Sequence, residues 1–158
     1  MPVEIERKFL VKGDQWRSVV KSTQRLKDGL LAQFGGGKVR VRLAENRAWV
    51  TIKGPRVGAA RSEYEYEIPC ADAEEMLRTL CNGQVIEKTR GLAPYGGLTW
   101  MIDVYEGALE GLVIAEIELE HEGQALELPM WIGREVTHDS KYKKTRLLSD
   151  GEFNLTLI

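Results

Sequence analysis

The sequence predicts a protein of the α+β class that is mainly β, with about eight antiparallel strands and two or three helices. Apolar and polar residues alternate with a period of two through most of the chain, which is the pattern of half-buried strands. Strands and helices do not alternate as they do in βαβ units, which favours antiparallel pairing. Several strands also carry charged residues at alternate positions, so one face of the sheet is predicted to be ionic.

The first half of the chain contains five predicted strands and one short helix. Val3 to Val11 forms the first strand, and Asp14 is expected to cap a helix over Gln15 to Val20. Turns at Gly35–Gly37 and Glu45-Asn46 separate the strands that follow. These strands span residues 24–34, 38–44, 48–53 and 61–68.

The second half contains the clearest predicted helix, Ala71 to Cys81. Asp72 is its predicted N-cap, because Glu75 follows at the spacing of a capping box. Its apolar stripe would comprise Met76, Leu77 and Leu80. Three more strands are expected at residues 85–92, 98–105 and 112–120. The pattern then weakens, which predicts a loop with a short helix at 131–144 and a final strand or ordered tail at 152–158.

Length and composition indicate one soluble globular domain over residues 1–158. The chain has 158 residues, which is enough for a substantial core. Apolar residues make up 43% and charged residues 29%, which excludes a disordered chain. The formal net charge is −2, so no overall basic field attracts nucleic acid and no such partner is expected. Any affinity for anions must therefore come from local arrangement.

The cysteines and the N-terminus predict a cytoplasmic protein. Cys70 and Cys81 are the only cysteines and no CxxC motif occurs, so both are expected to be reduced structural thiols. The N-terminal segment is charged from residue 4, unlike a signal peptide. No apolar run approaches the roughly 20 residues of a membrane span, so no membrane partner is expected.

Like charges recur two residues apart on the same face of several predicted strands, about 7 Å from one another. Neighbours of one sign are unfavourable at this distance unless something neutralises them. A solvated face with acidic and basic strands paired across would also give charged rows. Two features argue against a solvated face. Few Ser or Thr residues occur among the charged residues of this face, and positive and negative charges are segregated strand by strand. The rows are Glu4, Glu6 and then Lys8; Arg40 and Arg42; Glu63, Glu65 and Glu67; Lys88 and Arg90; and Glu116, Glu118 and Glu120.

Separate acidic and basic rows have a chemical use. Carboxylate oxygens are the natural ligands of Mg²⁺ or Mn²⁺. Arg and Lys are the natural partners of phosphate oxygens, and Arg can bind two oxygens at once. A sheet closed on itself would bury these charges and strengthen each interaction. The pattern therefore predicts a site for a polyphosphate bridged by a divalent metal ion.

Seven ordered segments resemble the signature of the CYTH superfamily, the triphosphate tunnel metalloenzymes. EIERKFLV at residues 4–11 is similar to its ExExK motif, and the other segments follow in the order and spacing of that family. They are VRVRL (39–43), TIKG (51–54), EYEYEI (63–68), EKTR (87–90), IDVYEG (102–107) and AEIELE (115–120), with a further echo in SKYKK (140–144).

The resemblance implies a closed eight-stranded antiparallel β-tunnel, or barrel, with helices packed outside. It implies one or two Mg²⁺ or Mn²⁺ ions held by the carboxylates of Glu4, Glu6, Glu116 and Glu118. A second metal would also use Glu63, Glu65 and, less directly, Asp103. The resemblance assigns phosphate binding to Lys8, Arg40, Arg42, Lys53, Lys88 and Arg90, with Arg61 and Lys141 as further candidates.

The activity that the resemblance implies is metal-dependent hydrolysis of inorganic triphosphate, a short-chain polyphosphate, with Lys88, Glu116 and Glu118 as catalytic residues. Class IV adenylyl cyclases of this family usually carry His-Phe ahead of the ExExK strand, where only Met1-Pro2-Val3 stand here. A nucleoside or thiamine triphosphatase is another alternative. A module that binds polyphosphate without turnover is a third. Either a monomer or a homodimer is compatible with the apolar residues of segment 153–158.

Two positions depart from the family pattern. Short bacterial members often read Q-G-Y-L in the second strand, and that tyrosine has been proposed as a proton acceptor. This chain has Leu30 there, so a water on the metal or Lys88 would have to take that role. Members also often have Asn after Tyr-Lys near the C-terminus, where Lys144 stands here, which would alter the closure of the tunnel end or add a phosphate contact.

Overall fold

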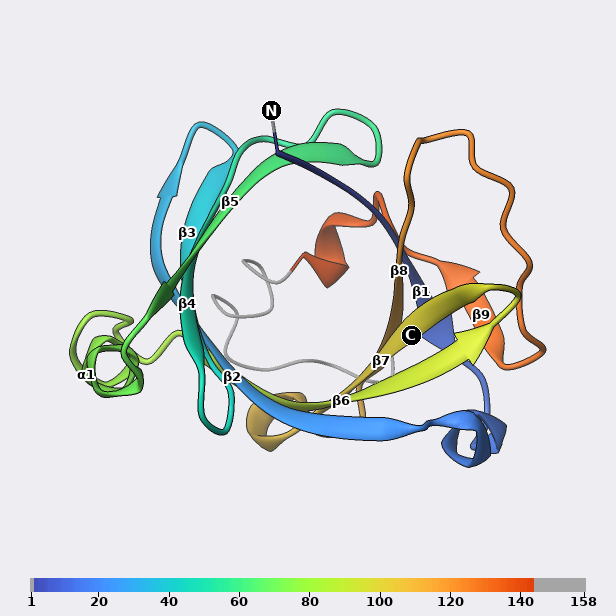
Figure 1. The fold of residues 1–158 in the computed structure, drawn as a ribbon, viewed down its shortest axis with the longest axis horizontal. Coiled ribbons are helices and arrows are strands. Elements are labelled where there is room, and N and C mark those ends of the chain that lie inside the picture. The colour runs from blue at the N-terminus through green and yellow to red at the C-terminus, as the bar shows by residue number, and fades with distance from the viewer. Residues whose placement is uncertain (1, 144–158) are drawn as a thin grey trace.

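Eight antiparallel strands close into a barrel in the computed structural model, which describes residues 2–143 (Figure 1). Around the ring, the order of strands is β1-β5-β4-β3-β2-β6-β7-β8, and β8 pairs with β1 to complete it. The predicted mainly β fold with a closed eight-stranded tunnel is therefore confirmed. The strands are β1 (Val3–Val11), β2 (Ser22–Phe34), β3 (Gly37–Leu43), β4 (Ala48–Lys53), β5 (Ala60–Ile68), β6 (Val85–Tyr95), β7 (Leu98–Tyr105) and β8 (Val113–Glu118).

A ninth strand, β9 (Ile132–Glu135), lies outside the ring against β1. One edge of β1 is shared by two partners, since Val3 to Ile5 pair with β5 whereas Phe9 and Val11 pair with β9. The sequence predicted loop and short helix in this region, and that prediction missed the strand. The reason is physical: β9 has four residues and two register pairs, which is too short for a visible alternation.

The α-helix of the described chain, α1 (Cys70–Thr79), packs on the outside of β2, β3 and β4 (Figure 1). The predicted N-cap was wrong, because the helix begins at Cys70 and its N-cap is Pro69, in extended conformation, three residues before Asp72. Asp72 lies inside the first turn, where its charge favours the helix dipole. Leu80 was also wrongly assigned to the apolar stripe, since it is exposed. Short 3₁₀ helices are η1 (Gln15–Val19), η2 (Gly107–Leu109) and η3 (Ser140–Tyr142).

Hydrophobic clusters cover the barrel from outside and also fill one part of its interior. The largest packs η1 and the segment before β9 against β1, β7 and β8, around Trp16, Trp100 and Trp131. A second packs α1 on β3. A third lies inside, because Tyr105 and Ile114 face the same side as the charged residues opposite them in register, Lys88 and Asp103. Tyr142 of η3 joins this interior cluster, so η3 lies within the opening of the ring (Figure 1).

Gly29 of β2 allows α1 to approach the barrel closely. A Cβ atom at this position would overlap the Cys81 Sγ and lie 2.7 Å from the Leu77 Cδ2. We expect Gly29→Ala to lower the free energy of unfolding by about 1–3 kcal/mol, because overpacking a rigid contact displaces both elements. Urea unfolding measures this, and Gly123→Ala is the control, since no heavy atom lies within 4 Å of its Cβ position. Equal stability of the two variants would contradict this close packing.

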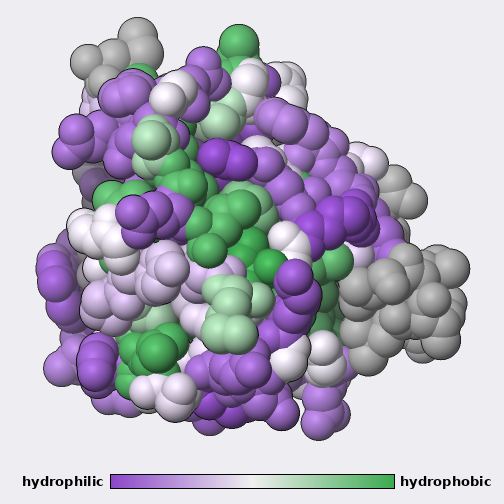
Figure 2. Space-filling model, turned by 90° about the vertical axis from the view of Figure 1, so that its right-hand side faces the viewer, coloured by the Kyte–Doolittle hydropathy of each residue, from purple (hydrophilic) through white to green (hydrophobic). Residues whose placement is uncertain are grey.

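The outer surface on the side of β9 is mostly hydrophilic, with hydrophobic residues gathered near its centre (Figure 2). Cys70 and Cys81 are both free thiols, as predicted. Among the described residues, no helix has the length and apolar character needed to cross a membrane. The predicted final strand or tail at 152–158 and the departure at Lys144 lie outside the described residues.

Candidate active site

Strand alternation turns the predicted charged rows toward the inside of the barrel. Residues directly opposite one another in antiparallel strands point to the same face. Glu6 and Lys8 of β1 lie opposite Glu118 and Glu116 of β8, and Glu4 lies opposite Arg61 of β5. The predicted acidic rows of β1 and β8 are therefore adjacent, and they form one wall of the tunnel.

The carboxylates of Glu4, Glu6 and Glu118 form a compact acidic group. One oxygen from each lies within 4.8 Å of the other two. Burial and the nearby Glu116 raise the pKa of Glu6 above its usual value. Burial and then Glu4 and Glu6 raise the pKa of Glu118 in the same direction. Both shifts reflect burial first and crowded negative charge second, and a cation at this group would neutralise that charge.

Lys53 and Glu63 border the acidic group on the β4–β5 side. The Lys53 ammonium lies 3.1 Å from both the Glu4 Oε2 and the Glu63 Oε2. Glu63 is opposite Lys53 in register, so this contact follows from strand pairing. Burial opposes ionisation of Glu63, but hydrogen bonding at Glu4 and the charge of Lys53 hold its pKa below the usual value. Glu65 is more exposed and accepts a hydrogen bond from the Thr51 hydroxyl at 3.2 Å.

A second wall, formed by β2, β3, β6 and β7, holds a chain of buried ion pairs. Asp28 accepts two hydrogen bonds from Arg42, at 2.7 and 2.8 Å. The Lys88 ammonium lies 3.6 Å from the Asp28 Oδ2 and donates to the Asp103 Oδ2 at 2.8 Å. Arg90 donates to both oxygens of Asp103, at 2.8 and 3.0 Å. The order is therefore Arg42, Asp28, Lys88, Asp103 and Arg90, with alternating charge throughout.

The two aspartates of this chain are held ionised by their partners. Burial alone would raise the pKa of Asp103, but Lys88 and Arg90 lower it to about 2. Burial also opposes ionisation of Asp28, yet Arg42, Arg40 and Lys88 hold its pKa well below the usual value. Both oxygens of Asp103 already accept hydrogen bonds from cations. Asp103 therefore serves here as a counter-ion, and the structure does not bring it into the acidic group.

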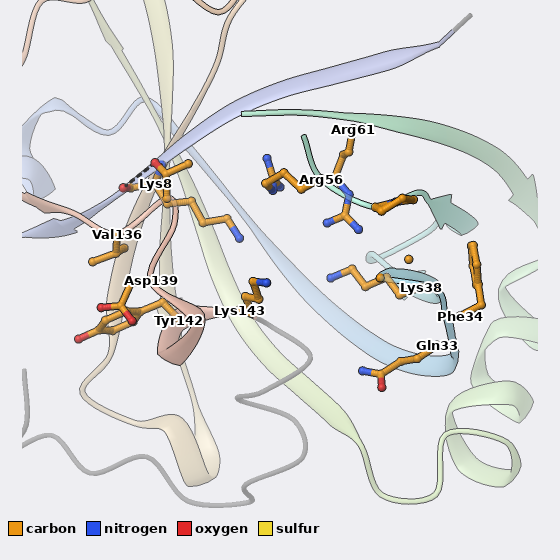
Figure 3. Close-up of a pocket in the computed structure, with 15 residues that line it drawn as sticks. Lys8, Gln33, Phe34, Lys38, Arg56, Arg61, Val136, Asp139, Tyr142 and Lys143 are labelled. Atoms are coloured by element: carbon orange, nitrogen blue, oxygen red, sulfur yellow. Dashed lines mark hydrogen bonds between the residues drawn. The ribbon is translucent and has the colours of Figure 1, made fainter. Parts of the chain in front are cut away.

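A cavity of about 540 Å³ opens beside the acidic wall and is lined by cations (Figure 3). Lys8, Lys38, Arg61 and Lys143 direct their charged ends toward the same space, and Arg56 lies next to Arg61 (Figure 3). Arg56 and Arg61 donate to the backbone carbonyls of Ala59 and Gly54, and neither has a carboxylate within 4 Å among the described residues. Five cations with one lining carboxylate, Asp139, make the cavity suitable for a multiply charged anion.

Arg40 lies on the tunnel wall between the ion-pair chain and the cavity. It is opposite Leu30 in β2 and Thr51 in β4, and its guanidinium donates to the Thr51 hydroxyl at 3.4 Å. Its Nε is buried and has no hydrogen-bond partner among the described residues. A buried guanidinium nitrogen without an acceptor is costly, so an anionic ligand would complete this site.

Leu30 is buried on the tunnel face, opposite Arg40, and its hydrocarbon side chain offers no proton acceptor. Tyr105 is a buried tyrosine beside the ion-pair chain, with the Lys88 ammonium 5.5 Å from its ring centroid. Burial and then Asp103 raise the pKa of Tyr105 well above its usual value. This phenol therefore stays protonated and does not replace the missing base.

The structure brings most of the predicted site residues into the tunnel but not all of them. Lys141 does not line the cavity, and its ammonium lies over the Tyr142 ring at 5.6 Å, whereas Lys143 takes the lining position. Sequence reasoning also missed Lys38, Arg56 and Asp28. Lys38 and Asp28 could have been found from alternation, since they share a face with Arg40 and Leu30. Arg56 follows Pro55 outside any strand and had no such signal.

The charged tunnel has counterparts in known proteins. Residues 2–148 match the CYTH domain. The chain belongs to the CYTH family. Two CYTH-like relatives are each named inorganic triphosphatase. The one from Acetivibrio thermocellus is 43% identical over 95% of this chain and 96% of its own length. The one from Nitrosomonas europaea is 36% identical over 91% of this chain and 95% of its own length. The crystal structure of an inorganic triphosphatase shares the CYTH fold of this chain, with a TM-score of 0.66, 30% identity, and coverage of 94% and 95% of the two chains.

Proposed function

We propose that this protein is a metal-dependent hydrolase of inorganic triphosphate. The observation that carries the proposal is the acidic group of Glu4, Glu6 and Glu118 beside a cation-lined cavity within one closed barrel. Two residues that line the cavity join them, because Lys8 lies 3.8 Å from Glu6 and Arg61 lies opposite Glu4 in register. Hard divalent cations prefer carboxylate oxygens, and phosphoryl oxygens prefer Arg and Lys. The two similar proteins named inorganic triphosphatase cover nearly the whole chain, which supports the same substrate for this one.

The residues present fit a bound Mg²⁺ or Mn²⁺ ion. Glu4, Glu6 and Glu118 would hold it, with Glu116 as a further ligand beside Glu6. Glu63 and Glu65 would contribute to a second ion, as the resemblance to the family implied. When bound, the metal polarises phosphoryl oxygens and lowers the pKa of water, which is the chemistry that hydrolysis of a phosphoric anhydride needs.

The cations of the tunnel would bind and orient the triphosphate. Lys8 and Arg61 line the cavity, and the buried Arg40 Nε has no hydrogen-bond partner among the described residues, so these side chains are placed to donate hydrogen bonds to phosphoryl oxygens directly. Lys53, Arg42, Lys88 and Arg90 are already paired, so they would stabilise charge mainly through their field. Water adds to a terminal phosphorus, the bridging P–O bond breaks, and phosphate and pyrophosphate leave with release of a proton.

Lys88 would act as a cation in this reaction and not as the base. A protonated lysine has three donors and no acceptor, and two carboxylates favour the charged form of this buried side chain. Lys88 would therefore offset the negative charge that develops during P–O cleavage. Glu116, which lies opposite Lys8 and 3.7 Å from Arg90, and Glu118 remain the other proposed catalytic residues.

A substrate panel tests the function and its alternatives together. Purified protein would be incubated with Mg²⁺ or Mn²⁺ and with triphosphate, ATP or thiamine triphosphate, while phosphate, pyrophosphate and cyclic AMP are measured. We expect phosphate and pyrophosphate from triphosphate, with the highest kcat/KM of the three substrates. Cyclic AMP from ATP would instead indicate the cyclase, and tight triphosphate binding without any product would indicate a binding module.

The location, the domain organisation and the partners of the protein are the subject of further proposals. Two free thiols agree with a reducing compartment, and we propose a cytoplasmic location for a single-domain protein over residues 1–158. The partner is a small-molecule polyphosphate, with neither nucleic acid nor membrane expected. The hydrophobic patch of Figure 2 lies among hydrophilic residues, and both a monomer and a homodimer remain consistent with it.

A further inference from the structure

Asp28 is a buried residue that lies between Arg42 and Lys88 in the ion-pair chain. Its side chain is 4% exposed, and the residue lies in the middle of β2. Both of its oxygens are occupied by Arg42, which lies directly opposite in β3. Its Oδ2 also faces the Lys88 ammonium at 3.6 Å, from the neighbouring strand on the other side. Asp28 thus links the cations of two strands.

Lys88 depends on two aspartates for its position. Its side chain is wholly buried, with Asp103 on one side, Asp28 on the other and the Tyr105 ring beneath. Asp103 of β7 accepts hydrogen bonds from both Lys88 and Arg90. Its contact with Lys88 draws the lysine ammonium toward β7. The opposing attraction of Asp28 on β2 keeps Lys88 between the two strands. Because a lysine side chain has four rotatable bonds, such two-sided support fixes where its charge lies.

The same aspartate also sets the charge of this wall. Arg42, Lys88 and Arg90 bring three positive charges, and Asp28 and Asp103 bring two negative charges. Without Asp28, the balance would change from one net positive charge to two. In a buried setting this change strengthens the attraction for a phosphate anion. Asp28 therefore weakens anion binding at the same time as it orders the cations.

We propose that Asp28 is a positioning residue that fixes Lys88 and Arg42 for triphosphate hydrolysis and limits how tightly the tunnel binds anions. This inference rests on the proposed function. Asp28 touches neither the acidic group nor the cation-lined cavity, so it acts through its two partners. Limiting the affinity for anions favours catalysis, because equal stabilisation of substrate, products and transition state does not raise kcat.

The test uses Asp28→Asn and Asp28→Glu, with metal-free triphosphate binding measured by calorimetry and hydrolysis measured as kcat and KM. We expect Asp28→Asn to bind triphosphate about tenfold more tightly while kcat falls at least about tenfold, because charge is gained and Lys88 loses one anchor. Asp28→Glu keeps the charge and should bind within about threefold of wild type, with a lower kcat from its longer side chain. Glu67→Gln is the control, since it removes an exposed two-bond partner of Arg47.

Opposite changes in affinity and kcat separate positioning from a general structural role, which would weaken binding and turnover together. Parallel losses in either variant, unchanged kcat in Asp28→Asn, or failure of both variants to fold would overturn the proposal. A wild-type protein that binds triphosphate without hydrolysing it would contradict the proposed function instead. The affinity change in Asp28→Asn would still be measurable in that case, so the two failures are distinguishable.

Discussion

A Glu6→Gln variant is expected to lose at least about 100-fold of the metal-dependent triphosphate hydrolysis while it keeps its fold. Glu6 is a buried member of the acidic group, and one of its oxygens lies within 4.8 Å of an oxygen of Glu4 and of Glu118. Gln has nearly the same shape but lacks the charge that binds a divalent cation. Because burial and Glu116 raise the pKa of Glu6, its ionised form destabilises the metal-free fold at neutral pH. The variant should therefore melt at the same Tm as the wild type or higher.

Two measurements on this variant separate loss of metal from loss of structure. The first is phosphate release from triphosphate, and the second is the rise in Tm when Mg²⁺ or Mn²⁺ is added. We expect both to disappear in Glu6→Gln. Glu120→Gln is the control, since Glu120 belongs to the predicted acidic row of Glu116 and Glu118 but is exposed beyond the end of β8. A Glu6→Gln protein with full turnover would show that the acidic group does not hold the metal.

Asp103→Asn is expected to destabilise the protein by about 3–5 kcal/mol at pH 7. Asp103 is wholly buried and accepts hydrogen bonds from both Lys88 and Arg90. Asparagine would leave these two buried cations without their shared counter-ion, and desolvation makes an uncompensated buried charge costly. Urea unfolding of the metal-free protein measures the change. Glu135→Gln, which removes an exposed partner of Arg7, should cost about 1 kcal/mol or less.

The pH dependence of stability gives an independent check on Asp103. Its pKa is about 2 in the folded protein, below the ordinary value of 3.8. A lowered folded pKa means that the ionised form stabilises the fold above the unfolded pKa, and that this stability is lost as the pH falls through the folded pKa. The wild type should lose stability between about pH 4 and pH 2, and Asp28 contributes in the same direction. A wild-type profile that is flat over this range would contradict the ion-pair chain.

The sequence predicted the barrel well because its signal is repeated on every strand. Alternation in β1, β3 and β8 placed Glu6, Arg40 and Glu116 on the inner face, and strand register then brought them to one tunnel. The sequence did not predict β9, because this strand has only four residues and pairs with the part of the β1 edge that β5 leaves free. The start of α1 was misplaced because Pro69 ends the preceding extended segment and Asp72 resembles a cap in sequence alone.

The roles of the charged residues were harder to predict than their positions. Alternation shows that Asp103 faces inward. Whether it binds a metal ion or pairs with Lys and Arg side chains depends on which strand lies beside it. The register of β6 against β7 places Arg90 opposite Asp103 and makes it a counter-ion. Asp28 was overlooked because a single acid among Leu26 and Leu30 does not form a row, although it pairs with two cations from neighbouring strands.

Metal-dependent release of products from triphosphate is the most direct measurement of the central claim, that the acidic group and the cation-lined cavity form one hydrolytic site. Purified protein would be given triphosphate with Mg²⁺ or Mn²⁺, and a parallel sample would contain EDTA. The proposal predicts phosphate and pyrophosphate in equal amounts with metal, and neither with EDTA. Absence of both products with either metal, from protein that binds triphosphate, would contradict it.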